Sequence, residues 1–227
     1  MVVFDYPCYP IGKTRITSPF KVTKELYTSK PVVAAFDFDG TLTRRDSFLP
    51  FLLHVAGTPL FMMKMLALTP VFAGLTLGLL DRDSAKAAVI ASFLTDRSLR
   101  AIRSQAESFV QLVLPRLVNR KAIERFRWHR LRGDRCVLVS ASPEVYLRPW
   151  AMSVGFDDVI GTVLEVGSEG LLTGRLQGKN CRGEEKVRRL ELLIGPLEQY
   201  IIYAYGDSSS DKPLLSVSQH AYYRRIP

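Results

Sequence analysis

Cysteine is scarce in this chain of 227 residues, which contains only Cys8, Cys136 and Cys181. The number is odd, and no two cysteines lie close together in the sequence, so neither a disulfide framework nor a zinc motif is present. We therefore expect the protein to work in a reducing compartment. The first residues also lack the charged start, long apolar centre and small-residue cleavage site of a secretory leader, and we expect none.

A clean bilayer-spanning run is also lacking, because a spanning helix needs about 20 consecutive apolar residues. The most apolar segment, 48–80, carries Lys64 as its single formal charge, and Pro59 and Pro70 interrupt it. Two interpretations of this segment stay open. Its helices are either buried against the core or a partner chain, or they are short helices that enter one leaflet of a membrane.

Acidic residues are in the minority, with 22 Asp and Glu against 31 Lys and Arg, for a formal net charge of +9. Because 47% of the residues are hydrophobic, the composition excludes an intrinsically disordered chain. A basic and apolar chain suits nucleic acid, an anionic membrane surface or a phosphorylated substrate. A strongly basic helix predicted at 115–132 is either a solvated face or a patch that meets membrane or substrate. Its aromatic residues form no stacking ladder, so we expect no nucleic acid partner.

Short apolar strands alternate with helices along the chain. We predict strands at 31–38, 136–139 and 200–205, a hairpin at 162–176, and helices at 82–114, 115–132 and 184–194. We also expect Ser142 to cap a further helix that opens with Pro143 and Glu144. This alternation predicts an α/β fold with a Rossmann-like, doubly wound parallel sheet. The helical stretch after the first strand is too long for one crossover. We therefore predict an N-terminal extension at 1–30, a catalytic core at 31–47 and 133–227, and a helical cap inserted at 48–132.

Polar side chains follow the three predicted core strands. They are Asp37, Asp39 and Thr41 after the first strand, Ser140 after the second, and Asp207 and Asp211 after the third. The carboxyl ends of parallel strands meet at one edge of a sheet, where ligands bind. Clustered carboxylates repel one another unless a cation lies between them, and Mg²⁺ prefers such oxygen ligands. The pair Asp37 and Asp39 has the residue types for nucleophilic attack on phosphorus and for proton transfer.

Four segments in this order resemble the motifs of the haloacid-dehalogenase-like phosphatases. They are D-F-D-G-T-L-T at 37–43, V-L-V-S at 137–140, Lys186 within C-R-G-E-E-K, and G-D-S-S-S-D at 206–211. The resemblance implies an enzyme that hydrolyses phosphomonoesters with Mg²⁺ through an aspartyl-phosphate. It makes Asp37 the nucleophile and Asp39 the general acid and base.

The same resemblance assigns the remaining residues of the site. Ser140 and Lys186 would bind the transferring phosphoryl group, with Thr41 as a further donor from the tight turn after Asp39. Lys179 is a nearby competitor of Lys186 but has the poorer motif context. Asp207 would hold Mg²⁺ together with Asp37 and the main-chain carbonyl of Asp39, and Asp211 would support the metal.

The position of the predicted cap is similar to that in the phosphoserine-phosphatase-like branch of the family. The C-terminal segments N-C-R-G-E-E-K-V-R-R-L and Q-H-A-Y-Y-R are similar to the bacterial phosphatidylglycerophosphatase C group. This likeness implies a phospholipid head-group phosphate as substrate and a place at the cytoplasmic face of the inner membrane, or in the cytoplasm. A small soluble ester such as phosphoserine is one alternative. A non-catalytic basic protein that binds lipid or nucleic acid is another.

Overall fold

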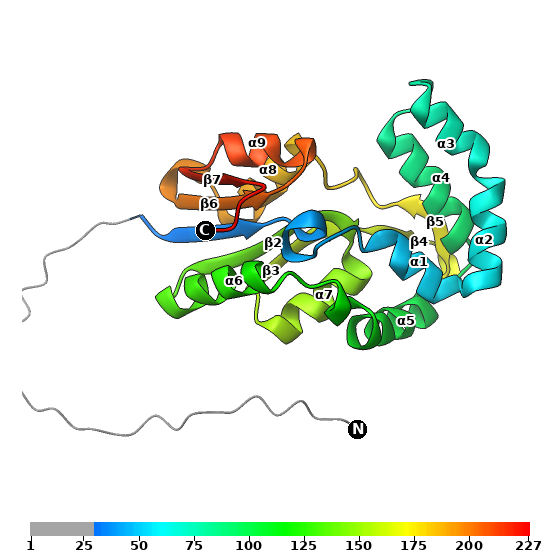
Figure 1. The fold of residues 1–227 in the computed structure, drawn as a ribbon, viewed down its shortest axis with the longest axis horizontal. Helices are drawn as coiled ribbons and strands as arrows, with labels where there is room; N and C mark the ends of the chain where they lie inside the picture. The colour runs from blue at the N-terminus through cyan, green and yellow to red at the C-terminus, as the bar shows by residue number, and fades with distance from the viewer. Residues whose placement is uncertain (1–29) are drawn as a thin grey trace, which may run out of the picture.

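The computed structural model describes residues 30–227, so the predicted N-terminal extension and Cys8 lie outside the described residues. Its centre is a sheet of five parallel strands, as Figure 1 shows. In spatial order the strands are β3 (Asp158–Thr162), β2 (Arg135–Pro143), β1 (Val32–Phe36), β6 (Ile201–Gly206) and β7 (His220–Tyr223). The predicted α/β fold with a parallel sheet is confirmed.

Both faces of the central strands β1, β2 and β6 are largely buried, which explains the uninterrupted apolar runs in these strands. Ala34 and Phe36 of β1 pack into one hydrophobic cluster, whereas Val33 and Ala35 pack into a second cluster on the other face. Helices cover both faces of the sheet (Figure 1). Helices α6 (Arg120–Arg132) and α7 (Glu144–Val154) lie on one side, and α8 (Glu184–Ile194) and α9 (Lys212–Ser216) lie on the other.

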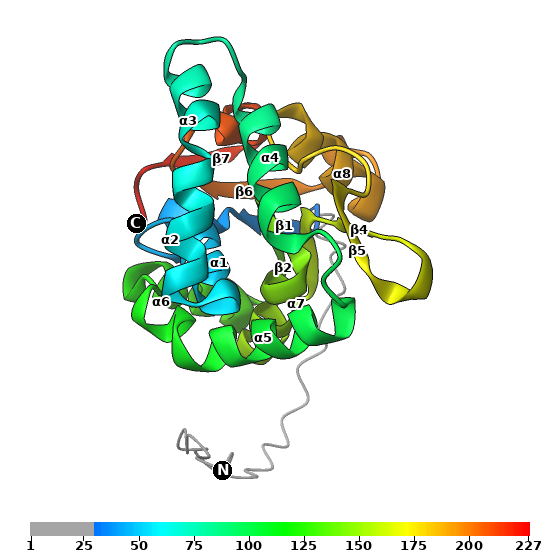
Figure 2. The ribbon, with the colours of Figure 1, turned by 90° about the vertical axis from the view of Figure 1, so that its right-hand side faces the viewer.

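The segment between β1 and α6 forms five α-helices. They lie beside the carboxyl edge of the sheet (Figures 1 and 2). They are α1 (Phe48–Ala56), α2 (Thr58–Ala67), α3 (Thr69–Thr76), α4 (Arg82–Leu94) and α5 (Leu99–Leu112). Pro59 and Pro70 occupy the first turns of α2 and α3, where a missing N–H costs little. Neither α2 nor α3 contains a buried residue. Phe61, Met65, Val71 and Phe72 are partly buried against the core cluster. Met62, Met63 and Leu66 of α2 are exposed.

No single helix between residues 30 and 227 combines the length and apolarity of a bilayer span. Helices α2 and α3 meet that criterion only as a pair, and they are bent by 51° relative to each other.

The predicted hairpin is present as β4 (Leu164–Val166) and β5 (Leu172–Leu176), which pair antiparallel. It packs against α4, while the basic helix α6 packs against β2. The boundaries of core and cap stay a prediction. These contacts favour grouping the hairpin with the cap helices and α6 with the sheet.

Several predicted boundaries were wrong. Strand β2 continues past Ser140 to Pro143, because Pro143 still pairs with Thr162 beyond a register shift. Ser142 therefore does not cap the next helix; Pro143 occupies the cap position. The segment 82–114 is two helices, with a break at Thr95–Ser98.

The basic helix begins at Arg120, and Pro115 belongs to a separate short turn. Backbone hydrogen bonds from Arg44 to Leu117 and from Asn119 to Leu42 hold the chain extended between the two. Strands β3 and β7 were not predicted. Both are short, and β7 lies at the sheet edge with mostly exposed side chains.

Candidate active site

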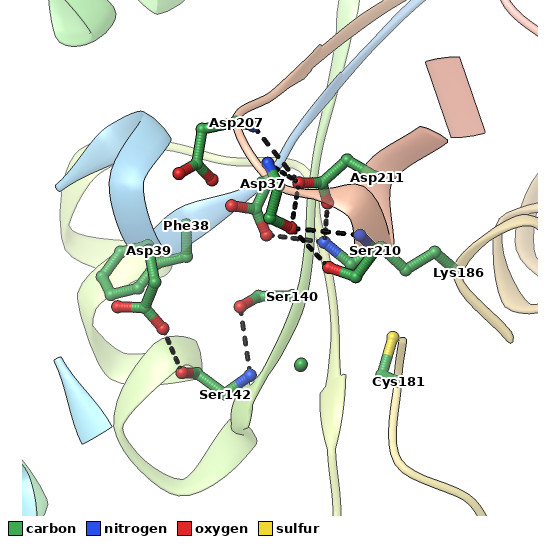
Figure 3. A network of polar contacts seen from close by, with 12 residues as sticks. Asp37, Phe38, Asp39, Ser140, Ser142, Cys181, Lys186, Asp207, Ser210 and Asp211 are labelled. Carbon is green, nitrogen blue, oxygen red and sulfur yellow. Dashed lines mark hydrogen bonds and ion pairs between the residues drawn. The ribbon is translucent and has the colours of Figure 1, made fainter. Parts of the chain in front are cut away.

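The sheet register brings the predicted strand ends together. Phe36 of β1 pairs with Leu138 of β2 on one side and with Tyr205 of β6 on the other. The residues that follow these pairs therefore emerge at one edge, where Figure 3 shows Asp37, Ser140 and Asp207 around a common space. The backbone N–H of Asp37 donates to the carbonyl of Tyr205 at 2.9 Å, which fixes the start of this turn.

Lys186 joins two of the carboxylates. It comes from α8 and is fully buried, and its Nζ lies 2.6 Å from Oδ1 of Asp37 and 2.6 Å from Oδ1 of Asp211. Burial raises the pKa of Asp37 to about 7, although the Lys186 cation opposes this change. Burial also acts to lower the pKa of Lys186, but the two carboxylates outweigh it and hold that pKa above its ordinary value. The lysine is therefore a permanent cation in the site.

Asp37, Asp207 and Asp211 each place a carboxylate oxygen within 4.8 Å of the others. Oδ1 of Asp207 is buried and has no hydrogen-bond partner among the described residues. Burial, together with the charge of Asp211, raises the pKa of Asp207. An unpartnered buried carboxylate oxygen beside two further carboxylates is suited to a hard divalent cation. The donor set therefore fits Mg²⁺.

Asp211 differs from the other two carboxylates because both of its oxygens are engaged. Oδ1 accepts from Lys186, and Oδ2 accepts from the backbone N–H and the hydroxyl of Ser208, at 2.9 and 2.8 Å. Burial acts to raise the pKa of Asp211, but Lys186 and these donors lower it overall. Asp211 is therefore arranged to hold the lysine and the Asp207 turn in place.

The turn after β1 brings the backbone close to Asp207. Gly40 has φ = +82°, a left-handed conformation that favours glycine, and a Cβ there would lie 2.2 Å from Oδ2 of Asp207. The next residue, Thr41, has a buried hydroxyl with no partner among the described residues, and its carbonyl accepts from Nδ2 of Asn119 at 3.1 Å. A free donor thus remains in this turn.

Asp39 faces the other side of the crevice, toward the cap. Its Oδ1 accepts from the backbone N–H of Ser47 at 2.7 Å, and its Oδ2 accepts from the hydroxyl of Ser142. Burial, reinforced by the nearby charge of Asp46, raises the pKa of Asp39 to about 6. A carboxyl with such a pKa can both donate and accept a proton near neutral pH.

Ser140 is buried between these two groups of residues (Figure 3), and its Oγ accepts from the backbone N–H of Ser142 at 3.1 Å. The structure places Lys186 in this cluster, while the competitor Lys179 is exposed. Ser142 is not among the predicted site residues, because a serine before Pro-Glu indicates a helix cap. Lys86 of α4, whose Nζ donates to the carbonyl of Ala141, was not predicted either. No sequence signal separates that lysine from a solvated one.

The model of the haloacid dehalogenase-like hydrolases matches residues 34–216. Protein CicA of Caulobacter vibrioides is 37% identical over 195 residues, covering 86% of each chain. A histidinol-phosphatase of Neisseria meningitidis is 35% identical over 92 residues, which are 38% of this chain and 41% of that protein. The chain therefore belongs to the haloacid dehalogenase-like hydrolases. Its relatives in this family include a phosphatase.

Solved structures share the fold. A protein of unknown function from Bordetella pertussis has a TM-score of 0.72 and 27% identity, covering 83% of this chain and 87% of that one. A phospho-aspartyl intermediate analogue of phosphoserine phosphatase has a TM-score of 0.55 and 19% identity, covering 84% of both chains. The second likeness concerns the fold alone.

Proposed function

We propose that the protein is a Mg²⁺-dependent phosphomonoesterase in which Asp37 forms an aspartyl-phosphate. One observation carries this proposal: Asp37 is paired through Oδ1 with a fully buried lysine, and a second carboxyl, Asp39, lies two residues further on with its own hydrogen-bond partners. Asp37, Asp207 and the carbonyl of Asp39 would hold Mg²⁺, with Asp211 in support. Bound there, the ion supplies positive charge that offsets the carboxylates and the phosphate oxygens.

The two carboxyl groups divide the chemistry between them. The Asp37 carboxylate attacks phosphorus while the bond to the leaving oxygen breaks, and Asp39 gives that oxygen its proton. Asp39 then takes a proton from a water molecule that attacks the aspartyl-phosphate, which releases inorganic phosphate and restores Asp37. The hydrogen bonds from Ser47 and Ser142 keep Asp39 oriented for both transfers. Lys186, Ser140 and Thr41 bind the phosphoryl oxygens.

We propose a phospholipid head-group phosphate as the substrate class, such as phosphatidylglycerophosphate, and action at the cytoplasmic face of the inner membrane. The apolar surface of α2, α3 and the turn that follows α3 supports this. Its side chains that are more than half exposed include Met62, Met63, Leu66, Leu77 and Leu79. Contiguous exposed apolar surface is a feature of membrane and protein contact sites. We call α2 and α3 the apolar arm and propose that it enters one leaflet.

A small soluble phosphoester such as phosphoserine is the second candidate. The fold shared with phosphoserine phosphatase favours it, because the structural match covers 84% of both chains. The two candidates have the same catalytic residues and differ only in what the cap helices contact.

A phosphate-release panel tests both parts of the proposal. Purified protein with Mg²⁺ is given phosphatidylglycerophosphate in detergent micelles, phosphoserine and glycerol phosphate, with Asp37→Asn as the control. We expect the lipid ester to be hydrolysed fastest and the variant to be inactive on every ester. Turnover of soluble esters alone would overturn the lipid assignment. No turnover of any ester, with tight binding of lipid or nucleic acid, would instead support a non-catalytic binding protein.

A further inference from the structure

Lys86 crosses from the cap helices to the catalytic edge of the sheet. It lies on α4, and its Nζ donates to the carbonyl of Ala141 at 2.5 Å and to Oδ1 of Asn180 at 2.7 Å. Ala141 stands between Ser140 and Ser142 in β2. The ammonium group therefore contacts the residue that separates two serines of the site. Ser140 is the predicted phosphate-binding serine, and Ser142 holds Asp39.

The partners of Lys86 are neutral, in contrast with those of Lys186. Lys186 is balanced by two carboxylates, whereas no ion pair of Lys86 exists within residues 30–227, and both of its hydrogen bonds end on carbonyl oxygens. Burial lowers the pKa of Lys86 to about 8, with Asp39 as the largest opposing charge. Withdrawing a cation from water without a direct ion pair costs free energy. An anion that binds to the ammonium group would offset this cost in free energy.

Hydrogen bonds hold the neighbours of Lys86 in place without a bound ligand. The amide of Asn180 donates from Nδ2 to Oδ1 of Asp83 at 2.7 Å, which turns its carbonyl oxygen toward Lys86 and the Thr162 hydroxyl. The ammonium also lies 5.7 Å from the centre of the Phe48 ring. These contacts come from the cap and from the sheet side together, so the position of the amino group is set by several elements.

Lys86 lies on the side of the site where the leaving alcohol of a substrate would bind. Asp39 gives its proton to the leaving oxygen, so the leaving alcohol lies on the side of the crevice that Asp39 and Ser142 face. We propose that Lys86 binds an anionic group carried by the leaving alcohol, either the phosphodiester of a phospholipid or the carboxylate of a small acid. This inference rests on the proposed function and narrows its substrates to phosphomonoesters that hold a second negative charge.

Two soluble esters of matched size test the proposal. Glycerol phosphate has a neutral leaving alcohol, and phosphoglycerate carries a carboxylate in place of the hydroxymethyl group. We expect the wild type to prefer phosphoglycerate in kcat/KM and Lys86→Met to lower that preference about tenfold or more, because a hydrogen-bonded ion pair is lost. Lys64→Met is the matched control. Lys64 also donates to a backbone carbonyl, that of Ser92, and lies over a phenylalanine ring, and its loss should leave the preference unchanged.

Phosphatidylglycerophosphate in micelles distinguishes the two sources of the anion, since a larger effect of Lys86→Met on this lipid than on phosphoglycerate assigns the phosphodiester. Equal losses on charged and neutral esters would overturn the proposal and leave Lys86 as a structural link between cap and core. Calorimetric binding of the same esters to Asp37→Asn, with and without Lys86→Met, needs no turnover. A wild type without activity contradicts the proposed function, whereas equal affinities of the two Asp37→Asn proteins for phosphoglycerate contradict the role of Lys86.

Discussion

The hydroxyl of Ser142 donates a hydrogen bond to Oδ2 of Asp39, and this contact joins the ends of two neighbouring strands. Oδ1 of the same carboxyl accepts from the backbone N–H of Ser47, at the start of the cap helices. The Asp39 carboxyl is therefore held by one group from the sheet and one from the residue that precedes the first cap helix. A proton-transferring group must keep such an orientation to be effective.

Replacing Ser142 tests this positioning. In Ser142→Ala we expect kcat to fall roughly tenfold, about the value of one hydrogen bond to a charged group, with KM little changed. Ser142→Thr keeps a hydroxyl and should recover most of the lost rate. Steady-state kinetics on one ester provide the comparison. A rise in KM at constant kcat would show that Ser142 binds substrate and does not orient Asp39.

The approach of Gly40 to Asp207 gives a prediction about the metal. In Gly40→Ala the added Cβ would lie 2.2 Å from Oδ2 of Asp207 and push the carboxylate away. We expect the Mg²⁺ concentration for half-maximal activity to rise about tenfold or more, since one proposed Mg²⁺ ligand is displaced. Gly133→Ala is the control, because Gly133 has a similar φ of +77° but open space around it. It should lower the melting temperature without changing the Mg²⁺ requirement.

His129 predicts how stability depends on pH. Its Nδ1 lies 2.7 Å from Oδ2 of Asp134 and its Nε2 lies 2.8 Å from the Tyr205 hydroxyl. Burial lowers the pKa of His129 below its ordinary value of 6.5, despite the charge of Asp134. The native state therefore favours the neutral ring, so this stabilisation is complete above pH 6.5 and is lost as the pH falls toward the lowered value.

We expect the free energy of unfolding to decrease below pH 6.5 by up to about 1.4 kcal/mol per pH unit from this single group. His129→Gln removes the titrating group and should flatten the dependence in denaturant titrations between pH 7 and 5. An equally steep dependence in the variant would assign the effect to other residues.

We expect the apolar arm to bind lipid vesicles. Replacing Met63 and Leu66 together by Gln should weaken binding to vesicles of phosphatidylglycerol and phosphatidylethanolamine at least about tenfold, because buried apolar area is lost. The melting temperature should hold, since these side chains are 61% and 76% exposed. Met152 and Leu192 are the matched control pair outside the arm, since they are 71% and 72% exposed. Replacing both by Gln should leave vesicle binding, measured by sedimentation, unchanged. Equal effects of the two pairs would contradict a role of the arm.

The edge of the sheet was predictable from sequence because polar residues end its buried apolar runs. Asp37, Ser140 and Asp207 each follow such a run, and parallel pairing brings their side chains to one edge. Lys186 was predictable only through its motif, since a lysine on a charged helix is ordinarily solvated. Local sequence alone does not indicate that α8 directs this side chain into the crevice.

The contacts of Ser142 and Lys86 could not be predicted from sequence, because they depend on tertiary structure. The serine was expected to cap a helix, but pairing of Pro143 with Thr162 keeps β2 extended and leaves the hydroxyl free to contact Asp39. Lys86 gains its position from the docking of α4 against residues almost a hundred positions later, including Asn180. Short-range patterns carry no information about such contacts.

Trapping the phosphorylated enzyme tests the central claim most directly. Wild-type protein and Asp37→Asn are mixed with Mg²⁺ and a hydrolysed ester, quenched in acid within one turnover and digested for mass spectrometry. We predict one added phosphoryl group on the wild-type peptide that contains Asp37, and none on any peptide of the variant. A phosphoryl group on another residue, or phosphate release that continues in Asp37→Asn, would contradict the assignment of Asp37 as the nucleophile.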